Sequence, residues 1–309
     1  MHPLVVESTI SDGIDISVVI ASYNSMPLVF ETLHSLRHQE GIKPEEYEVI
    51  LADSSTDGTH DAVREKFPEV KVVHSDVQKY PGAARNMGIT ESQGSIVAFI
   101  DADAYASPRW LERIRHHHKQ AGVAAVGGPI LNGNPEKFFG WVLYWSEFTG
   151  YTAVSPETQR RVIPTCNLSI KRRAFDENGP FLEEQFGNED VLLTENLRKA
   201  GLGPLFKRDM PVYHVNRYRW SEIAPHLRKL GRCTGVARMK FDVAGAGTFR
   251  TWRKHLILPL IPLYKWLLIC GRTIRDDPGR LMRLGAVSPW LFAGLIHWTL
   301  GMRDGLRKG

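Results

Sequence analysis

Two aspartates, Asp101 and Asp103, follow directly after the apolar run 95–100. An apolar run of this length that ends in polar residues is typical of a buried strand in a parallel sheet. Residues two apart in an extended chain point to the same side, so both carboxylates are expected to face one place at the strand end. Two neighbouring carboxylates repel each other unless a cation lies between them, and Mg²⁺ or Mn²⁺ prefers such oxygen ligands. The pattern predicts a divalent metal site, and the alternative is a solvated acidic loop.

The strand that carries these aspartates belongs to a series of alternating strands and helices. Short apolar runs rich in β-branched residues predict the strands, and helical spacing of leucines among charges predicts the first helix. The predicted strands are 16–21, 47–52, 70–74, 95–100 and 123–128, and the predicted helices are 26–39, 60–67 and one that opens at 81. This repetition indicates an α/β fold, with a Rossmann-like, mostly parallel sheet wrapped by helices.

Polar side chains at the strand ends predict a nucleotide-sized ligand site at one edge of this sheet. These residues are Tyr23 and Asn24 after the first strand, Asp53 after the second, and Asp101 and Asp103 after the fourth. The sequence has no G-x-G-x-x-G and no G-K-[ST] pattern, so the phosphates of a nucleotide must be bound by other groups than a glycine-rich loop. A metal ion at Asp103 and the guanidinium of Arg85 would supply positive charge, because arginine matches phosphate oxygens bidentately.

Four motifs, in order, resemble those of the inverting family-two nucleotide-sugar glycosyltransferases. They are V-I-A-S-Y-N at 19–24, D-S-S-T-D-G-T at 53–59, G-A-A-R-N at 82–86 and D-A-D at 101–103. Two further stretches, at 165–172 and 187–201, are similar to the acceptor-side strand and the Glu-Asp helix of that family. The resemblance covers roughly residues 14–220 and implies the A-type glycosyltransferase fold.

The resemblance also implies a donor site for a nucleotide sugar, with a UDP-sugar favoured. Ala21 and Tyr23 would line the base and ribose pocket, and Asp53 would accept a hydrogen bond from a uracil-type N–H group. Arg85 would lie near the diphosphate, and Asp101 would contact ribose or metal.

The same resemblance implies a Mn²⁺ or Mg²⁺ ion as cofactor. Asp103 would ligate the ion, with Asp101 beside it. His214, in the stretch V-Y-H-V-N, lies where family members often supply a further metal ligand. A purely structural histidine after a strand is an equally good interpretation of His214.

On the acceptor side the resemblance assigns Asp190 as the general base and Glu189 as a ligand of acceptor hydroxyls. Both acids precede a helical pattern, so they lie where the helix dipole favours carboxylates, and Asp190 is expected to be ionised at neutral pH. The alternative is that the two acids serve only the dipole. Processive members carry a Q-x-x-R-W motif after the base, whereas residues 228–233 read R-K-L-G-R-C, so transfer of a single sugar is expected.

Two tempting patterns have simpler interpretations. His116, His117 and His118 could suggest a metal cluster, but adjacent residues of a helix point in different directions, so a solvated helix face is predicted. Asp57, within the second motif, is interpreted first as a cap of the helix that follows.

Composition and charge place the protein at a membrane surface in a reducing compartment. The three cysteines, Cys166, Cys233 and Cys270, are odd in number and far apart, which disfavours disulfides and a zinc site. The first residues lack the features of a signal peptide, so the catalytic face is expected in the cytosol. Residues 201–309 carry 20 Lys and Arg against 6 Asp and Glu, and residues 1–200 carry 19 against 28. The basic part also holds the longest apolar runs, which favours a membrane over nucleic acid as the partner.

The two apolar runs, 256–270 and 284–300, are short for membrane spans and contain prolines. Basic residues flank both runs on every side, which argues against a two-span hairpin. Helices that lie in the membrane interface are therefore predicted, anchored by Trp252, Trp266, Trp290 and Trp298. The alternative is a helical layer packed on the enzyme core or on another subunit. The expected domains are a catalytic domain at 1–220 and a basic helical appendage at 221–309.

Together these features indicate a metal-dependent inverting glycosyltransferase at the cytoplasmic face of a membrane, with a lipid-linked or envelope saccharide as acceptor. A nucleotidyltransferase that makes activated sugars is the second interpretation, although 21–25 is not the basic glycine-rich loop it would need. A catalytically inactive glycan-binding scaffold is the third, and the intact acids at 101, 103 and 190 argue against it.

Overall fold

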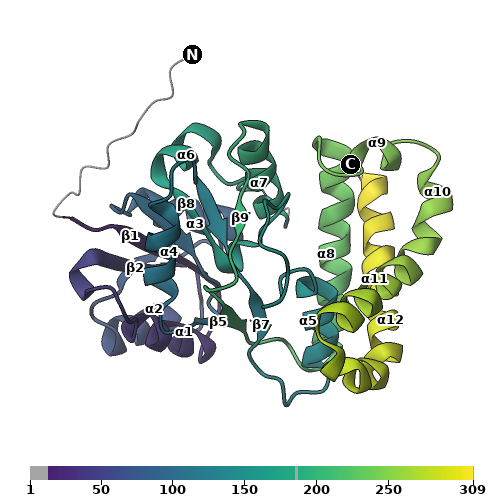
Figure 1. Cartoon of the computed structure of the whole chain (residues 1–309), viewed down its shortest axis with the longest axis horizontal. Coiled ribbons are helices and arrows are strands. Elements are labelled where there is room, and N and C mark those ends of the chain that lie inside the picture. The colour runs from purple at the N-terminus through teal and green to yellow at the C-terminus, as the bar shows by residue number, and fades with distance from the viewer. Residues whose placement is uncertain (1–12, 185–186, 309) are drawn as a thin grey trace.

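The computed structural model describes residues 13–184 and 187–308. It contains an α/β part, a small second sheet and a helical part (Figure 1). The N-terminal stretch on which the expectation about a signal peptide rests lies outside the described residues.

The central sheet has seven strands in the order β3-β2-β1-β4-β8-β6-β9. The strands are β1 Ile16–Ser22, β2 Tyr47–Asp53, β3 Lys71–His74, β4 Ile96–Phe99, β6 Ala125–Gly127, β8 Leu168–Lys171 and β9 Leu205–Phe206. The strands β3, β2, β1 and β4 pair in parallel, and β8 runs antiparallel to both of its neighbours. The mostly parallel α/β sheet predicted from the sequence is confirmed.

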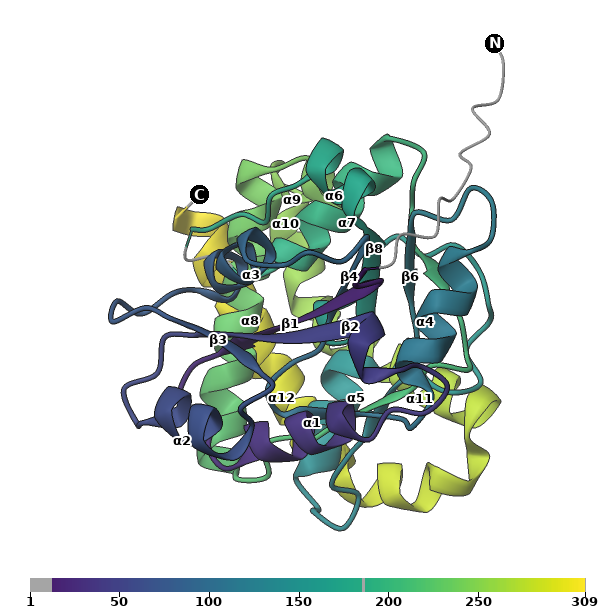
Figure 2. The same cartoon turned by 90° about the vertical axis from the view of Figure 1, so that its left-hand side faces the viewer.

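Helices cover both faces of the sheet because the strand side chains alternate between two apolar layers. The helices α1 Leu28–Arg37 and α2 Thr59–Lys66 pack on the layer that holds Val18 and Ile20, whereas α3 Pro81–Thr90 packs on the opposite layer with Val19 (Figure 2). The helices α4 Trp110–His118, α6 Arg172–Asn178 and α7 Glu189–Lys199 complete the α/β part.

A three-stranded sheet lies beside the end of β4. It consists of β5 Ala104–Ala106, β7 Ile130–Asn132 and β10 Val212–His214, in the order β5-β10-β7. The strand β10 runs antiparallel to β5 and places His214 opposite Ala104. This pairing brings a late segment of the chain back to Asp103.

The helical part is built around two long helices, α8 Trp220–Lys240 and α12 Leu281–Lys308, which lie side by side (Figure 1). The other helices are α5 Gly140–Phe148, α9 Ala246–Phe249, α10 Lys254–Ile257 and α11 Ile261–Asp276. Four glycines bring the backbones of α8 and α12 into contact: a Cβ atom at Gly231, Gly235, Gly301 or Gly305 would collide with a backbone carbonyl of the facing helix. Small residues four apart on both helices are what such a close crossing requires.

One expectation from the sequence is wrong, and the packing of one apolar run bears on a second. His117 and His118 are buried rather than solvated, because α4 packs on the sheet: the ring of His118 is hydrogen-bonded to Ser169 and that of His117 to Asp209. The apolar run 284–300 buries one of its faces inside the protein, where Leu284, Val287, Leu291 and Leu295 pack. Trp290 and Ile296 on the same run are 42% and 40% exposed, so an interfacial position of this run stays a prediction.

Candidate active site

The predicted donor residues gather at the carboxyl ends of β1, β2 and β4. Asp101 and Asp103 follow β4 in a turn in which the Asp101 carbonyl accepts the Ala104 N–H at 3.1 Å. Their side chains are about one third exposed, 31% for Asp101 and 36% for Asp103, so both remain accessible to a ligand. The local pattern of an apolar strand followed by two acids thus produces the predicted edge site.

Three of the candidate ligands form one cluster. The side-chain oxygens of Asp101 and Asp103 and a ring nitrogen of His214 all lie within 4.8 Å of one another. Nε2 of His214 lies 3.4 Å from Oδ1 of Asp103. Two carboxylates and an imidazole fit a divalent ion, and the imidazole favours Mn²⁺ over Mg²⁺ because Mg²⁺ prefers oxygen ligands.

Arg85 lies at the centre of the acidic site rather than at its surface. Its guanidinium is 6% exposed; Nη2 donates to Asp101 Oδ1 at 2.9 Å, and Nη1 donates to Glu189 Oε1 at 2.6 Å. Burial alone would lower the pKa of Arg85, but the charges of Asp101, Glu189 and Asp190 outweigh burial and raise it. Arg85 therefore holds Asp101 and Glu189 in place through its two terminal nitrogens, and its position near the diphosphate stays a prediction.

Glu189 and Asp190 open α7, directly after Asn188, whose φ of 84° lies in the left-handed region. Glu189 is buried and Asp190 is half-buried, with Asp190 Oδ1 accepting its nearest backbone donor, the N–H of Val191, at 2.8 Å. Burial and the adjacent charge of Glu189 raise the pKa of Asp190 to about 7, although Arg85 and the Val191 N–H oppose this. Burial and Glu189 therefore act against the helix dipole, which was expected to hold Asp190 ionised at neutral pH.

Asp53 lies at the end of β2 and is fully buried. Its oxygens accept from the hydroxyl of Ser55 at 2.6 Å, from the Ser55 N–H at 3.0 Å and from Nδ1 of His74 at 2.9 Å. Burial would raise the pKa of Asp53, but hydrogen bonds from Ser55, Ser22 and His74 outweigh burial and lower it. The nucleobase of a donor could reach the Asp53 carboxylate only if a neighbouring side chain moved aside.

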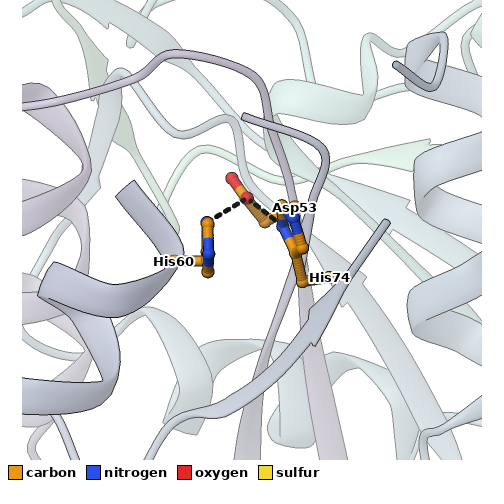
Figure 3. Close-up of side chains that lie close together, drawn as sticks. All are labelled: Asp53, His60 and His74. Carbon is orange, nitrogen blue, oxygen red and sulfur yellow. Dashed lines mark hydrogen bonds and ion pairs between the residues drawn. The ribbon is translucent and has the colours of Figure 1, made fainter. Parts of the chain in front are cut away.

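Two histidines that sequence reasoning missed flank Asp53 (Figure 3). The rings of His60 and His74 stack at a centroid distance of 3.7 Å, and Nδ1 of His60 lies 3.6 Å from Asp53. His74 ends β3, so the parallel pairing of β3 with β2 is the signal that could have placed it there. Nδ1 of both rings approaches the same oxygen, Asp53 Oδ2, at 3.6 Å for His60 and 2.9 Å for His74, so the two histidines cover this carboxylate.

The segments that follow β1 and β2 are hydrogen-bonded to each other at the edge of the sheet. Asn24 accepts the Thr56 N–H at 2.9 Å, and its own N–H donates to Ser55 at 2.7 Å. Tyr23, in the same segment, is 45% exposed, and Ala21 is half-buried. Asp57 Oδ1 accepts the N–H of Thr59, the first residue of α2, at 3.0 Å, so Asp57 serves the helix start from the position before the N-cap residue, Gly58.

Comparisons with known proteins agree with this geometry. The family model described as glycosyl transferase family 2 matches residues 17–179. The glycosyltransferase AglE of Haloferax volcanii is 31% identical over 206 residues, which cover 65% of this chain and 67% of that protein. Matches to several other curated relatives cover about half of their length or less, as with 23% of TarS, a poly(ribitol-phosphate) β-N-acetylglucosaminyltransferase of Staphylococcus aureus.

Solved structures show the same fold. The mannosyltransferase PcManGT from Pyrobaculum calidifontis, in complex with GDP-Man and Mn²⁺, superposes with a TM-score of 0.65 at 18% identity, covering 97% of this chain and 89% of that one. TarS 1–349 of S. aureus with UDP-GlcNAc gives a TM-score of 0.54 at 19% identity, covering 96% and 92%. The chain therefore belongs to glycosyl transferase family 2, and it is a glycosyltransferase with the A-type fold.

Proposed function

We propose that this enzyme transfers one sugar, with inversion, from a UDP-sugar to a lipid-linked or envelope saccharide at the cytoplasmic face of a membrane, and that it requires Mn²⁺ or Mg²⁺. The observation that carries the proposal is that one guanidinium, that of Arg85, contacts residues of two different candidate groups. Arg85 joins the ligand cluster of Asp101, Asp103 and His214 to the acidic pair of Glu189 and Asp190. A donor site and a base are thereby held next to each other.

In this proposal Asp101, Asp103 and His214 would hold the ion. When bound, the ion supplies Lewis-acid charge that stabilises the departing nucleoside diphosphate. Arg85 is a positioning residue that fixes Asp101 on the donor side and Glu189 on the acceptor side. The relative TarS, solved with UDP and with UDP-GlcNAc, supports a nucleotide-sugar donor for this chain.

Asp190 takes the proton of the acceptor hydroxyl as that oxygen attacks the anomeric carbon from the side opposite the leaving diphosphate. Its pKa of about 7 suits this task, because a general base works best when its pKa is near the working pH. Glu189 binds acceptor hydroxyls and keeps the charge around Asp190 negative. The sequence at 228–233, which lacks the processive motif, supports a single transfer.

The proposed function is tested by screening nucleotide sugars for thermal stabilisation and for Mn²⁺-dependent hydrolysis. A ligand that binds only the folded state adds about 2.7 kcal/mol at a concentration of 100 times its Kd, so the true donor should raise the Tm distinctly. If no nucleotide sugar were to raise the Tm or be hydrolysed with either metal, the proposed donor chemistry would be wrong.

We expect UDP to bind more tightly than ADP or GDP when the three are compared by calorimetry with Mn²⁺ present. A carboxylate accepts from the N–H of uracil, and Asp53 is the buried carboxylate at the end of β2. As a control, Tyr23→Ala should weaken all three nucleotides alike, because stacking on an aromatic ring is tolerant of base identity. Equal affinities for UDP, ADP and GDP, or a preference for GDP, would show that Asp53 stays hydrogen-bonded to Ser55 and His74 and does not contact the nucleobase.

The proposed membrane contact is the outer face of the segment 252–268. Within the described residues, one stretch, Lys254–Asp276, is long and apolar enough to cross a membrane, and only 22% of its apolar window is buried. The segment 252–268 carries large apolar side chains that are 48–69% exposed to solvent. They are those of Trp252, Leu256, Leu260, Leu263, Tyr264 and Leu267. The flanking arginines and lysines would bind anionic headgroups, so this face suits the interface.

We expect the double variant Leu260→Glu with Leu263→Glu to bind anionic vesicles about tenfold or more weakly in cosedimentation, because two exposed leucines are lost from the contact. The matched control is Val77→Glu, an equally exposed apolar residue on the α/β part. Truncation after Phe249 is a poor test, since it would remove α12 from its packing against α8. Unchanged vesicle binding by the double variant would place the membrane contact elsewhere.

A further inference from the structure

A cavity of about 570 Å³ lies between the segment 149–160 and α11. Its volume is in the range of small-molecule sites. It is separate from the acidic edge of the sheet, and its charged lining is mostly basic: Arg160, Arg272, Arg275 and the single acid Asp276. Arg275 binds Asp276 through two hydrogen bonds, at 2.5 and 2.8 Å. The one acid in the lining is therefore already engaged.

Arg160 and Arg272 have no ion pair with an acid among the described residues. Arg160 stacks on Phe206 at 4.9 Å and donates to the Pro156 carbonyl, but its Nε is buried without a hydrogen-bond partner. Burial and the charges of Arg272 and Arg275 lower the pKa of Arg160, against the opposing effect of Tyr151. Guanidinium groups gathered without a counter-charge are costly, and an anion with several oxygens would satisfy them.

The other wall of the cavity is apolar and continues onto the proposed membrane face. Leu267 and Leu268 line it from α11 and are 55% and 37% exposed. A hydrophilic anion alone would leave this wall unused. A ligand with a phosphate at one end and a hydrocarbon chain at the other would occupy the arginines and the leucines together.

One residue beside the cavity lining interacts electrostatically with the proposed base: Tyr151, which follows Gly150 of the lining. Tyr151 is within electrostatic range of Asp190, Arg160 and Arg272, and burial together with Asp190 raises its pKa to about 12. Tyr151 therefore interacts both with the arginines of the cavity and with the proposed base.

We propose that this cavity binds the phosphate or diphosphate of a long-chain alcohol, the lipid carrier of the acceptor, through Arg160 and Arg272. The inference rests on the proposed function, because it names the lipid on which the acceptor is carried. Arginine rather than lysine suits the site, since its planar fork holds two phosphate oxygens at once.

The test uses the full chain and calorimetry with three probes: farnesyl phosphate, farnesol and inorganic phosphate. Farnesyl phosphate is expected to bind more tightly than either fragment. Arg272→Gln should weaken it about 10–100-fold, the weight of one or two charge-assisted hydrogen bonds, and Arg272→Lys should weaken it less. Arg160→Gln should act in the same direction, but its contact with Phe206 makes Arg272 the cleaner probe. The matched control is Arg173→Gln, an exposed arginine paired with Glu177, which should change nothing.

Each contrary result has a definite meaning. If farnesol bound as tightly as farnesyl phosphate and Arg272→Gln had no effect, the cavity would be only an apolar groove. If inorganic phosphate bound as tightly as farnesyl phosphate, the cavity would be a site for free anions. Equal binding of vesicles of phosphatidylcholine with phosphatidylglycerol would make it a general headgroup contact. UDP binding separates the two proposals. If the native protein binds UDP but not farnesyl phosphate, only this inference is overturned. If the native protein does not bind UDP, the proposed function is overturned.

Discussion

The variant Asp190→Asn is expected to lower turnover by about 10²–10⁴-fold, the usual contribution of a positioned general base. The asparagine keeps the size of the side chain and its place at the start of α7 but cannot take a proton. Because its role concerns the acceptor, UDP affinity should stay unchanged, and the measurement is turnover with saturating donor and acceptor alongside calorimetry with UDP.

The pH dependence provides a second readout for the same residue. Since the pKa of Asp190 is raised to about 7, kcat/KM of the native enzyme should rise with pH through about 7, and this limb should vanish in Asp190→Asn. An acid whose pKa is higher in the folded state loses its stabilising contribution as pH rises through that value. The asparagine variant should therefore be at least as stable as the native enzyme at pH 8, which excludes unfolding as the cause of lost activity.

Glu189→Gln is the informative comparison for this prediction. It removes the charge that raises the pKa of Asp190 and also one partner of Arg85, so it should shift the pH limb downward and weaken acceptor use more than UDP binding. Near-native turnover of Asp190→Asn with saturating acceptor would mean that the base is another residue, with Glu189 the first candidate.

Asp103→Ala should lower turnover by about 10³-fold or more, because it removes a ligand of the ion that offsets the charge of the leaving diphosphate. The side chain is partly exposed, and its closest side-chain contact of this kind among the described residues is with His214, so the fold should survive the change. The direct readout is Mn²⁺ affinity by calorimetry, which should fall in Asp103→Ala and in His214→Ala.

The control for this change is Asp242→Ala, an exposed aspartate that pairs with Lys199 far from the cluster. In the native enzyme, excess chelator should abolish transfer, and Mn²⁺ should restore it better than Mg²⁺ because of the imidazole ligand. Full activity in excess chelator would contradict metal dependence, whatever the variants do.

Local sequence pattern was sufficient for five of the seven strands of the central sheet and for the positions of the acids on it. A strand of buried apolar residues cannot continue past two carboxylates, so Asp101 and Asp103 had to lie at its end. A helix start is a favourable place for acids, so the position of Glu189 and Asp190 could also be predicted from the residues alone. His214 was different: only the family resemblance pointed to it, since nothing local distinguishes it from a structural histidine.

The tertiary structure decided which of these groups meet and how they titrate. His214 reaches Asp103 only because β10 pairs with β5, and Arg85 joins Asp101 to Glu189 only because α3 and α7 pack together at the sheet edge. The pKa of Asp190 depends on the burial that this packing creates, which no local pattern contains. In the same way, the glycines of α12 let it pack against α8, so that one apolar face of this helix is buried inside the protein, which its sequence pattern alone did not show.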